Sequence, residues 1–482
     1  MKQYKWGKLT SFKRPIMGIL GVLLGLWIGF GVTPPASLTA AAEAAGSSGH
    51  FAMVVLGTLI WAICWWVGTV IPDWATGVGL MIFWTISGVA AFDISFSQYS
   101  GSIVWLLIGA FLVSTAVMKT GALRRLSLVL MSIFPPTIKG QVLALMGVGT
   151  VISPLVPSST AKAVLGTNIS LSTGKAMNFP PCSKGMTGLY MAAWTGFSLT
   201  VPAFITACAF GFMLKGALPG DISSGLTFTN WLVTMIPWLI VLLAGMFFLI
   251  LFLYKPSESS AMTKEYVQTE IESMGKISKK ELLSMIILLG CIVCWIFEKR
   301  LGVAAEITAL IGALLCYLFK ILEPKDLSER VAWPLIIFVG AVIQLGNMFS
   351  LTGINGWLTE LLHPIFTALD NKFLLVLCIV LLVTVVRFFV ASQGANLMLF
   401  VAILTPVAQS SGINPFVMGL IVYASQQLWF VPYQSTTYAP TLGVMDGYMR
   451  HGDAAKACFG YVGISLAGLL ISIPYWSLLG YM

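Results

Sequence analysis

The chain has 482 residues, of which 58% are hydrophobic and only 9% are charged. A soluble domain carries about 25% charged residues, so a chain this apolar could not cover its own surface in water. The composition therefore excludes a soluble protein and predicts one embedded in a lipid bilayer. The net charge of +9 does not indicate nucleic-acid binding, because the Lys and Arg residues lie at the ends of apolar runs, where membrane topology places them.

The first apolar run, residues 15–32, follows Lys13 and Arg14 and precedes an alanine-rich stretch at 40–45. This arrangement imitates a secretory signal peptide. Because many more apolar runs follow, we predict a first membrane helix instead, with a cytoplasmic N-terminus. Residues 1–50 are then an N-terminal cytoplasmic segment, this helix and an external loop.

Apolar runs long enough to cross a bilayer, about 17 to 25 residues each, recur along the chain. Further spans are predicted at 51–71, 76–93, 101–118, 187–213, 230–254, 282–298, 303–320, 333–350, 415–432 and 457–481. The connection at 255–281 mixes Lys and Glu and is predicted to be a solvated cytoplasmic linker. It divides the chain into a first repeat, 51–254, and a second repeat, 282–482.

Two apolar regions, 139–175 and 371–410, are not predicted to be simple spans. Each has small or polar residues at its centre, at 157–160 in the first region and at 391–394 in the second. Non-helical backbone at membrane depth is tolerated only where protein or a water-filled cavity surrounds it. We therefore predict a re-entrant hairpin in each repeat, with its tip at the polar centre.

Short sequence matches relate the two halves at an offset of about 232 residues. The matched pairs are Trp105 and Trp333, Cys64 and Cys294, Thr120 and Thr352, and the hairpin tips at Ser158 and Ser392. An odd number of crossings separates equivalent points, so the second half is predicted to be inverted relative to the first. Inverted repeats with broken helices near the bilayer midplane are typical of secondary transporters.

The predicted fold class is an all-α polytopic membrane protein with two inverted repeats, each with a re-entrant hairpin and a broken transmembrane helix. With a cytoplasmic N-terminus, the first hairpin enters from the cytoplasm and the second from outside. This topology agrees with the positive-inside rule nearly everywhere. The exception is the charged stretch at 298–300.

The hairpin tips carry hydrogen-bond donors that suit a carboxylate, which needs hydroxyls, amides and backbone N–H groups when it leaves water. The candidates are Ser158, Ser159 and Thr160 at the first tip, and Ser392, Gln393, Gly394 and Asn396 at the second. A single Ser or Thr in a membrane helix more often satisfies its own backbone. Two polar clusters at repeat-related positions favour a binding site.

Polar runs interrupt two further spans and are predicted to complete this site. The candidates are Thr195, Ser198 and Thr200 in the first repeat, and Pro432, Ser435, Thr436 and Thr437 in the second. A polar run around a proline cannot continue as a lipid-facing helix. For the second run, a loop at the membrane surface is the alternative.

Lys162 and Arg387 lie deep in apolar sequence, close to the predicted tips. A charge at the centre of a membrane helix costs about 3 kcal/mol on insertion scales, so such a residue usually pairs or faces a cavity. Neither hairpin core contains an acidic residue. An anionic substrate is therefore the expected partner, and snorkelling to the membrane interface is the alternative.

Other functional classes find no support in the sequence. A P-loop signature for ATP-driven pumping is absent. The His and Cys residues lack metal-ligand spacing, and the spans lack a catalytic constellation, so we predict neither a metal site nor an enzyme. A channel would need a continuous polar pore, whereas the polar residues cluster at two points. We therefore predict a transporter without a cofactor, with sodium as a possible coupling ion.

The first tip, Ser158-Ser159-Thr160, resembles the Ser-Asn-Thr signature of the divalent anion–sodium symporter family, which includes bacterial citrate, tartrate and dicarboxylate carriers. The second tip is a more degenerate form of the same signature, Ser392-Gln393-Gly394. The segments 105–125 and 432–456 are also similar to this family. The resemblance covers most of residues 50–480.

The resemblance implies an elevator-type carrier that works as a homodimer and binds substrate carboxylates at both tips. In sodium-coupled members the tips also bind sodium, which here would lie near Ser159, Gly394 and Thr436. Lys162 is similar to the exchanger branch, which swaps one dicarboxylate for another without sodium. That branch often has a His where this chain has Asn396, so the similarity is incomplete.

We therefore predict a multi-pass transporter of the cell membrane that carries small di- or tricarboxylate anions by exchange. Its expected partners are the anionic substrate, the lipid bilayer and a second copy of the chain. The open alternatives are a sodium-coupled carboxylate symporter and a carrier of another divalent anion, such as sulfate or a sulfonate.

Overall fold

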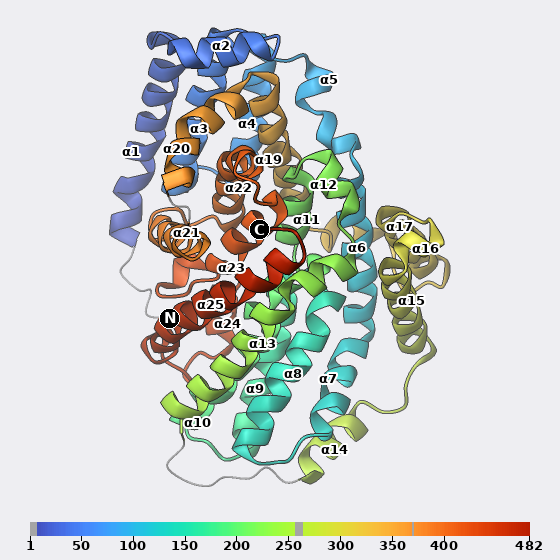
Figure 1. Cartoon of the computed structure of the whole chain (residues 1–482). Coiled ribbons are helices and arrows are strands. Elements are labelled where there is room, and N and C mark those ends of the chain that lie inside the picture. The colour runs from blue at the N-terminus through green and yellow to red at the C-terminus, as the bar shows by residue number, and fades with distance from the viewer. Residues whose placement is uncertain (1–6, 256–263, 369–370) are drawn as a thin grey trace.

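The computed structural model describes residues 7–255, 264–368 and 371–482, and these residues fold into helices without strands (Figure 1). The helices of the first half are α1 (Gly7–Leu26), α2 (Ala36–Ala44), α3 (Gly49–Gly68), α4 (Asp73–Ile86), α5 (Phe92–Ser95), α6 (Ser102–Thr120), α7 (Ala122–Ser132), α8 (Ile138–Ile152), α9 (Ser159–Ala176), α10 (Lys184–Trp194), α11 (Ala209–Ala217), α12 (Gly220–Gly225) and α13 (Phe228–Leu253). Those of the linker and second half are α14 (Lys264–Ser273), α15 (Lys279–Ile296), α16 (Glu298–Leu301), α17 (Ala305–Leu318), α18 (Pro324–Glu329), α19 (Trp333–Leu351), α20 (Ile354–Ala368), α21 (Lys372–Val386), α22 (Gln393–Ser410), α23 (Pro415–Ser425), α24 (Tyr438–Val444) and α25 (His451–Leu478).

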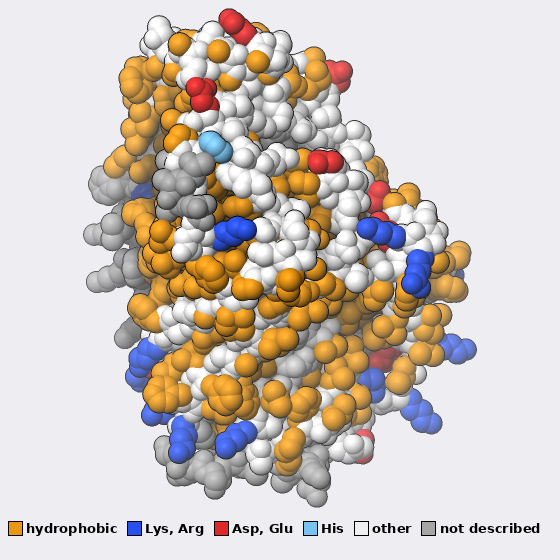
Figure 2. Space-filling view, in the orientation of Figure 1, with side chains coloured by type: hydrophobic (Ala, Val, Ile, Leu, Met, Phe, Trp, Pro, Cys, Tyr) orange, Lys and Arg blue, Asp and Glu red, His pale blue; other side chains and the backbone are white. Residues whose placement is uncertain are grey.

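Within the described ranges, seven helical stretches are long and apolar enough to cross a membrane. They are α1 with its π-helical end, α3, α6, α8 with the short turn after it, α13, α19 and α25. Hydrophobic side chains cover much of the visible surface, with most Lys and Arg in the lower half of the view and most Asp and Glu in the upper half (Figure 2). The positive-inside rule produces such an asymmetry. Which face is cytoplasmic stays a prediction.

Every predicted span coincides with a helix or a broken pair of helices. At α4 the helix ends earlier than predicted, at Ile86, because Gly88 adopts a φ of +74° and turns the chain. The predicted linker at 255–281 contains α14 and the start of α15, and part of it lies outside the described residues.

Several helices were not predicted, and α2, α7 and α20 are among them. The last two follow α6 and α19 across Gly121 and Gly353, whose φ values are +80° and +75°. In α7, Leu123, Leu128 and Met131 are buried, whereas Arg124 lies on the exposed side. A search for long apolar runs misses such amphipathic helices, because polar residues recur within them.

Both predicted hairpin regions break into two helices at the predicted tip, α8 and α9 in the first and α21 and α22 in the second, and their re-entrant course stays a prediction. Ser158 is the N-cap of α9, and its hydroxyl accepts a hydrogen bond from the Ala161 N–H at 3.4 Å. Ser392 caps α22 in the same way, accepting from the Ala395 N–H at 3.3 Å. A serine cap satisfies a backbone donor that hydrocarbon could not, which is why a helix can begin at this depth.

Two further spans are broken where their polar runs predicted. After α10, the chain passes through a π-helical turn, Thr195–Leu199, and two short 3-10 turns before α11. In the second half, α23 ends at Ser425 and α24 begins at Tyr438. Gln434 and Ser435 are buried within this second break. Protein therefore encloses the centre of this stretch, and a loop at the membrane surface stays the alternative.

The order of elements in the first half recurs in the second. The α8–α9 hairpin is followed by the broken α10–α11 span and the long α13. Likewise the α21–α22 hairpin is followed by the broken α23–α24 span and the long α25. This recurrence agrees with the sequence offset, and the inverted relation of the halves stays a prediction.

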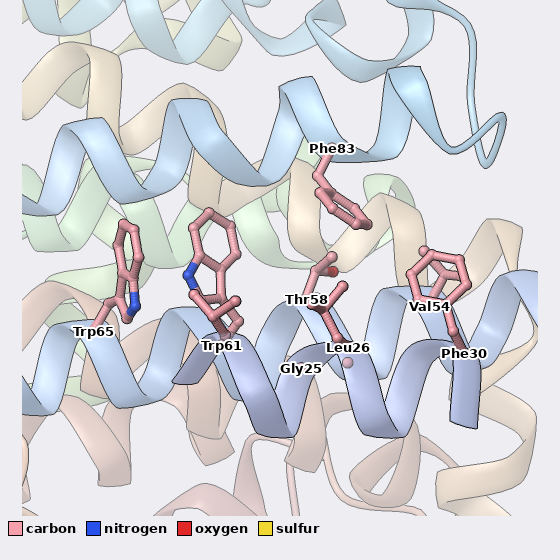
Figure 3. A pocket seen from close by; sticks show the side chains of 10 residues that line it. Gly25, Leu26, Phe30, Val54, Thr58, Trp61, Trp65 and Phe83 are labelled. Atoms are coloured by element: carbon pink, nitrogen blue, oxygen red, sulfur yellow. The ribbon is translucent and has the colours of Figure 1, made fainter. Parts of the chain in front are cut away.

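The N-terminal helix packs along α3 on one side of the molecule (Figure 1). The approach is close, since a Cβ on Gly57 would lie 2.8 Å from the backbone nitrogen of Gly29. Beside this contact, an apolar groove lies between α1, α3 and α4, where Trp61, Trp65 and Phe83 line it (Figure 3). Its lining is almost wholly apolar, which suits lipid chains rather than an anion.

The first hairpin packs against the π-helical turn of the first broken span through glycines. A Cβ on Gly149 of α8 would lie 2.5 Å from the carbonyl carbon of Gly196 and 2.6 Å from the backbone nitrogen of Phe197. No real Cβ comes so close to backbone atoms, so the two segments touch only because both residues are glycine. The contact fixes the first hairpin relative to the first break.

We expect Gly149→Val to destabilise the protein by about 3 kcal/mol, because overpacking forces backbone to shift. The measurement is the thermal unfolding midpoint in detergent. Gly147→Val on the same helix is the matched control, since a Cβ there meets only Phe134, at 3.8 Å. It carries the same change in helix propensity. Equal midpoints for the two variants would contradict the packing described here.

Candidate functional site

All four interrupted segments line one small cavity. Its lining residues are Ser159 of the first tip, Gln393 of the second tip, Trp194, Ser198, Val201, Cys208 and Phe210 of the first broken span, and Gln427, Ser435 and Thr437 of the second. The fold thus brings the tip at 158–160 close to the tip at 392–394, although the two are far apart in the sequence. Five of the predicted site residues meet here: Ser159, Ser198, Gln393, Ser435 and Thr437.

Three hydrogen-bond donors at this cavity have no partner among the residues that the structure describes. They are the hydroxyls of Ser159 and Ser198 and the indole N–H of Trp194. Leaving a buried donor unpaired costs about 1–3 kcal/mol, and native proteins keep few such groups. Unpaired donors that share one cavity are therefore suited to a ligand rich in acceptors, such as a carboxylate.

Aromatic rings hold Trp194 in place at the edge of the cavity. Its ring centroid lies 5.2 Å from that of Tyr438 and 6.0 Å from that of Trp429, both edge to face. Tyr190 stacks on it at 6.5 Å. Edge-to-face and stacked rings stabilise one another beyond their buried area. The indole N–H is therefore presented by a fixed ring and not by a mobile side chain.

Amide side chains join the second tip to the start of the second break. Gln393 Nε2 donates to Gln427 Oε1 at 3.4 Å, and Asn396 Nδ2 donates to Gln426 Oε1 at 3.3 Å. Asn396 Oδ1 and Gln426 Nε2 have no partner in the described part of the chain. Asn396 is fully buried and does not line the cavity, so its free oxygen is held within the protein.

Lys162 is fully buried, and oxygen atoms surround its ammonium group. Nζ donates to the Ser153 carbonyl at 3.1 Å, to the Ser153 hydroxyl at 2.9 Å and to the Ala207 carbonyl at 2.6 Å. All three ammonium protons are thereby used. Ser153 lies at the end of α8 and Ala207 in the first broken span, so Lys162 ties the first hairpin to the first break.

Arg387 does the same in the second half. Its side chain is fully buried, and Nη1 donates to the carbonyl of Val390 and, at 3.0 Å, to that of Ala391. Nη2 donates to the Gln434 carbonyl, in the second break. The guanidinium therefore ties the second hairpin to the second break.

Protein oxygens surround both cations, and an anionic substrate as the partner that balances their charge stays a prediction. Backbone oxygens accept hydrogen bonds from both of them, although Nε of Arg387 has no partner among the described residues, and neither residue lines the cavity. Snorkelling is wrong, because both side chains are fully buried. Neither cation forms an ion pair within the described residues. Two uncompensated positive charges therefore lie beside the tips, each held at a distance from the cavity itself.

The remaining predicted residues lie off the cavity. Thr195 and Thr200 donate to carbonyls one helical turn back, at 2.8 and 2.7 Å, so their hydroxyls are used locally. Ser158 and Ser392 cap their helices, Thr160 and Thr436 are exposed, Pro432 is half-buried, and Gly394 packs beside Phe338. The geometry thus narrows the candidate site to the ten lining residues.

The described residues contain no group of His, Cys, Asp and Glu that could hold a metal ion. Sodium would need several oxygen ligands at a tip. At the first tip, the oxygens of Ser153 and Ala207 are already bound to Lys162. At the second tip, the Asn396 oxygen is free. The residues present therefore fit an additional cation at the second tip better than at the first.

The family profile described as the sodium:sulfate symporter transmembrane region matches residues 44–482. The chain belongs to this family. The match confirms the resemblance found at the hairpin tips, and it includes every residue of the cavity. Membership of this family and the apolar helices place the chain in a membrane as a multi-pass protein.

Two curated relatives are similar to this chain over part of their length. The L-tartrate/succinate antiporter of Escherichia coli strain K12 is 27% identical over 311 residues, which is 62% of each chain. The putative malate transporter YflS of Bacillus subtilis is 26% identical over 299 residues, covering 60% of this chain and 62% of that protein. This symporter-family chain therefore spans somewhat less than two thirds of the length of these relatives.

The crystal structure of the Alcanivorax borkumensis YdaH transporter, which was reported to have an unusual topology, resembles the fold. The two chains superpose with a TM-score of 0.54 at 14% sequence identity, over 83% of this chain and 89% of that one. At this level of identity, the similarity shows the fold alone. It confirms an all-helical polytopic architecture.

Several residues of the candidate site were not predicted from the sequence. Trp194, Cys208 and Gln427 line the cavity, yet each stands in an apolar or amide-rich run without a distinguishing motif. Trp194 directly precedes the polar run at 195–200, which is the one signal that could have drawn attention to it. The structure also places the carboxylate of Asp73 against Ser392, and this contact was not predicted.

Proposed function

We propose that this chain is a secondary active transporter that exchanges small dicarboxylate anions across the membrane. Two named relatives, a tartrate/succinate antiporter and a putative malate transporter, support this substrate class. The unpaired donors of Ser159, Ser198 and Trp194 supply hydrogen bonds for carboxylate oxygens. Hydrogen bonds to a charged group are worth about 1.5–3 kcal/mol each.

The observation that carries the proposal is the binding of Lys162 and Arg387 by backbone oxygens. A ring of carbonyl oxygens at a break in a membrane helix is a site where transporters hold a coupling cation. Here the ammonium of Lys162 donates to such oxygens in the first half, and the guanidinium of Arg387 donates to such oxygens in the second. They act as built-in cations, and their two charges match those of a dicarboxylate.

Obligatory exchange follows from these fixed charges. The empty carrier holds two buried positive charges without acidic partners, and moving them through the membrane is unfavourable. A bound dianion neutralises them, so the loaded carrier crosses more easily. Sodium is then unnecessary, because the cation that it would supply is part of the chain.

In this conformation the cavity is too small for the proposed substrate. Its volume is about 20 Å³, room for about a single water molecule. A dicarboxylate therefore does not fit until a tip moves. We propose that one hairpin opens to admit the substrate, and that the hairpins with the broken spans then move as a unit in a homodimer, as in an elevator.

Counterflow is the experiment that tests the function. Vesicles that contain the purified protein and are loaded with succinate should take up labelled tartrate or malate at least about ten times faster than empty vesicles do. The rate should be equal in sodium and in choline buffer. Vesicles loaded with sulfate test the remaining anion class, and we expect them to resemble empty ones. Rapid uptake into empty vesicles would overturn exchange.

Sodium-coupled symport is the second candidate, and one observation favours it. The buried oxygen of Asn396 has no partner in the described part of the chain, and it lies at the second tip. Such an oxygen is suited to a cation. Under this reading, uptake into empty vesicles is fast in sodium and vanishes in choline, so the same experiment separates the two functions.

A further inference from the structure

Asp73, in the first turn of α4, makes a contact that the proposed function does not use. Its Oδ2 accepts a hydrogen bond from the Ser392 hydroxyl at 2.6 Å. The Ser392 oxygen also accepts from the Ala395 N–H at 3.3 Å. A hydroxyl has one proton to donate, and here that proton is given to Asp73. Ser392 cannot therefore donate to a bound substrate in this conformation.

The Asp73 carboxylate is bound at a hairpin tip as a substrate carboxylate would be. No cation forms an ion pair with it within the described ranges. Burial raises the pKa of the Asp73 carboxyl, whereas the hydrogen bond from Ser392 and the N-terminus of α4 both favour its charged form. A short hydrogen bond from a hydroxyl to a carboxylate is of the stronger, charge-assisted kind.

The contact joins the second hairpin to a part of the protein outside the cavity-lining segments. α4 packs tightly on α19, since a Cβ on Gly77 would lie 2.8 Å from the Ala341 Cβ. The second tip rests on the same unit, because a Cβ on Gly394 would lie 2.8 Å from Phe338 of α19. Asp73 therefore holds the second tip at Ser392, and the same tip also packs on α19 through Gly394.

We propose that Asp73 is an internal competitor of the substrate. Its carboxylate holds the second tip on the α4–α19 unit until a substrate carboxylate takes over the Ser392 hydroxyl. The inference rests on the proposed function, because it assumes that Ser392 binds substrate once it is released. Asp73 then sets the substrate concentration at which the second hairpin opens.

A double-mutant cycle tests whether Asp73 acts through Ser392. Asp73→Asn removes the charge of the carboxylate and so weakens its contact with Ser392. The substrate concentration for half-maximal exchange should therefore fall about five-fold. In a Ser392→Ala background, Asp73→Asn should change nothing further. The same five-fold change in both backgrounds would assign the effect to long-range repulsion and overturn the proposal. Asp93→Asn, at an exposed acidic residue of α5, is the control and should match the wild type.

Cross-linking tests the displacement without relying on the Ser392→Ala variant. The test uses a chain whose 8 native cysteines are replaced and which carries new cysteines at positions 73 and 392. These two cysteines should form a disulfide, because the side chains at these positions are in contact. Saturating succinate should slow its formation about ten-fold. A 93 and 392 cysteine pair is the control and should not cross-link. An absent disulfide, or one whose rate ignores succinate, would overturn the proposal.

The experiments distinguish a failure of the proposed function from a failure of the competitor role of Asp73. If wild-type vesicles show no counterflow with any dicarboxylate, the proposed function fails. If counterflow is normal while Asp73→Asn behaves as the wild type, the function stands and the competitor role fails.

Discussion

Replacing Lys162 by alanine should reduce dicarboxylate exchange at least about 100-fold. Removing one partner of a buried, hydrogen-bonded charge costs about 2–5 kcal/mol, and about 2.8 kcal/mol is a hundred-fold. The change also frees the oxygens of Ser153 and Ala207 and loosens the first hairpin from the first break. Counterflow into preloaded vesicles measures the loss.

The same variant tests whether the ammonium group stands in for a cation. The alanine leaves an oxygen-lined space, so sodium should restore part of the uptake in Lys162→Ala and have no effect on the wild type. Lys184→Ala, at an exposed lysine in the first turn of α10, is the charge-matched control and should retain full exchange. Wild-type rates in Lys162→Ala would show that the buried cation is dispensable.

Trp194→Phe should raise the substrate concentration for half-maximal exchange about 10- to 100-fold. The change keeps the ring among Tyr438, Trp429 and Tyr190 and removes only the unpaired N–H. A lost hydrogen bond to a carboxylate costs about 1.5–3 kcal/mol, which corresponds to this range. Initial rates of counterflow across a substrate series give the value.

Trp66→Phe is the matched control for this prediction. Trp66 is also buried, and its indole N–H also has no partner among residues 7–255, 264–368 and 371–482. It lies on α3 and does not line the cavity. Its replacement should leave the half-maximal concentration unchanged. Equal shifts in both variants would show that the loss reflects general packing and not substrate binding.

The sequence predicted the architecture well because membrane segments carry a strong, local signal. Long apolar runs locate the spans, and a polar cluster inside such a run can only lie in protein or at a cavity. That argument placed the breaks before Ser159 and Gln393, where α9 and α22 begin. It could not predict α7 and α20, because their apolar faces are too narrow to resemble a span.

The site was harder to predict because its geometry depends on where side chains point. Neighbouring residues at one tip diverge: Gln393 lines the cavity, while Ser392 is turned toward Asp73. The partner of Lys162 could not be found by searching for acidic residues, because its partners are main-chain carbonyls that every residue carries. Trp194 belongs to the site only because three distant rings orient it.

The main-chain nature of these partners bears on how the chain responds to random mutation. Every acceptor described for Arg387 is a backbone carbonyl, as are two of the three for Lys162. No side-chain substitution deletes a carbonyl oxygen. In a genetic screen for altered ion coupling, changes at the acceptor positions should therefore be rare, and the recovered alleles should concentrate at codons 162 and 387 themselves.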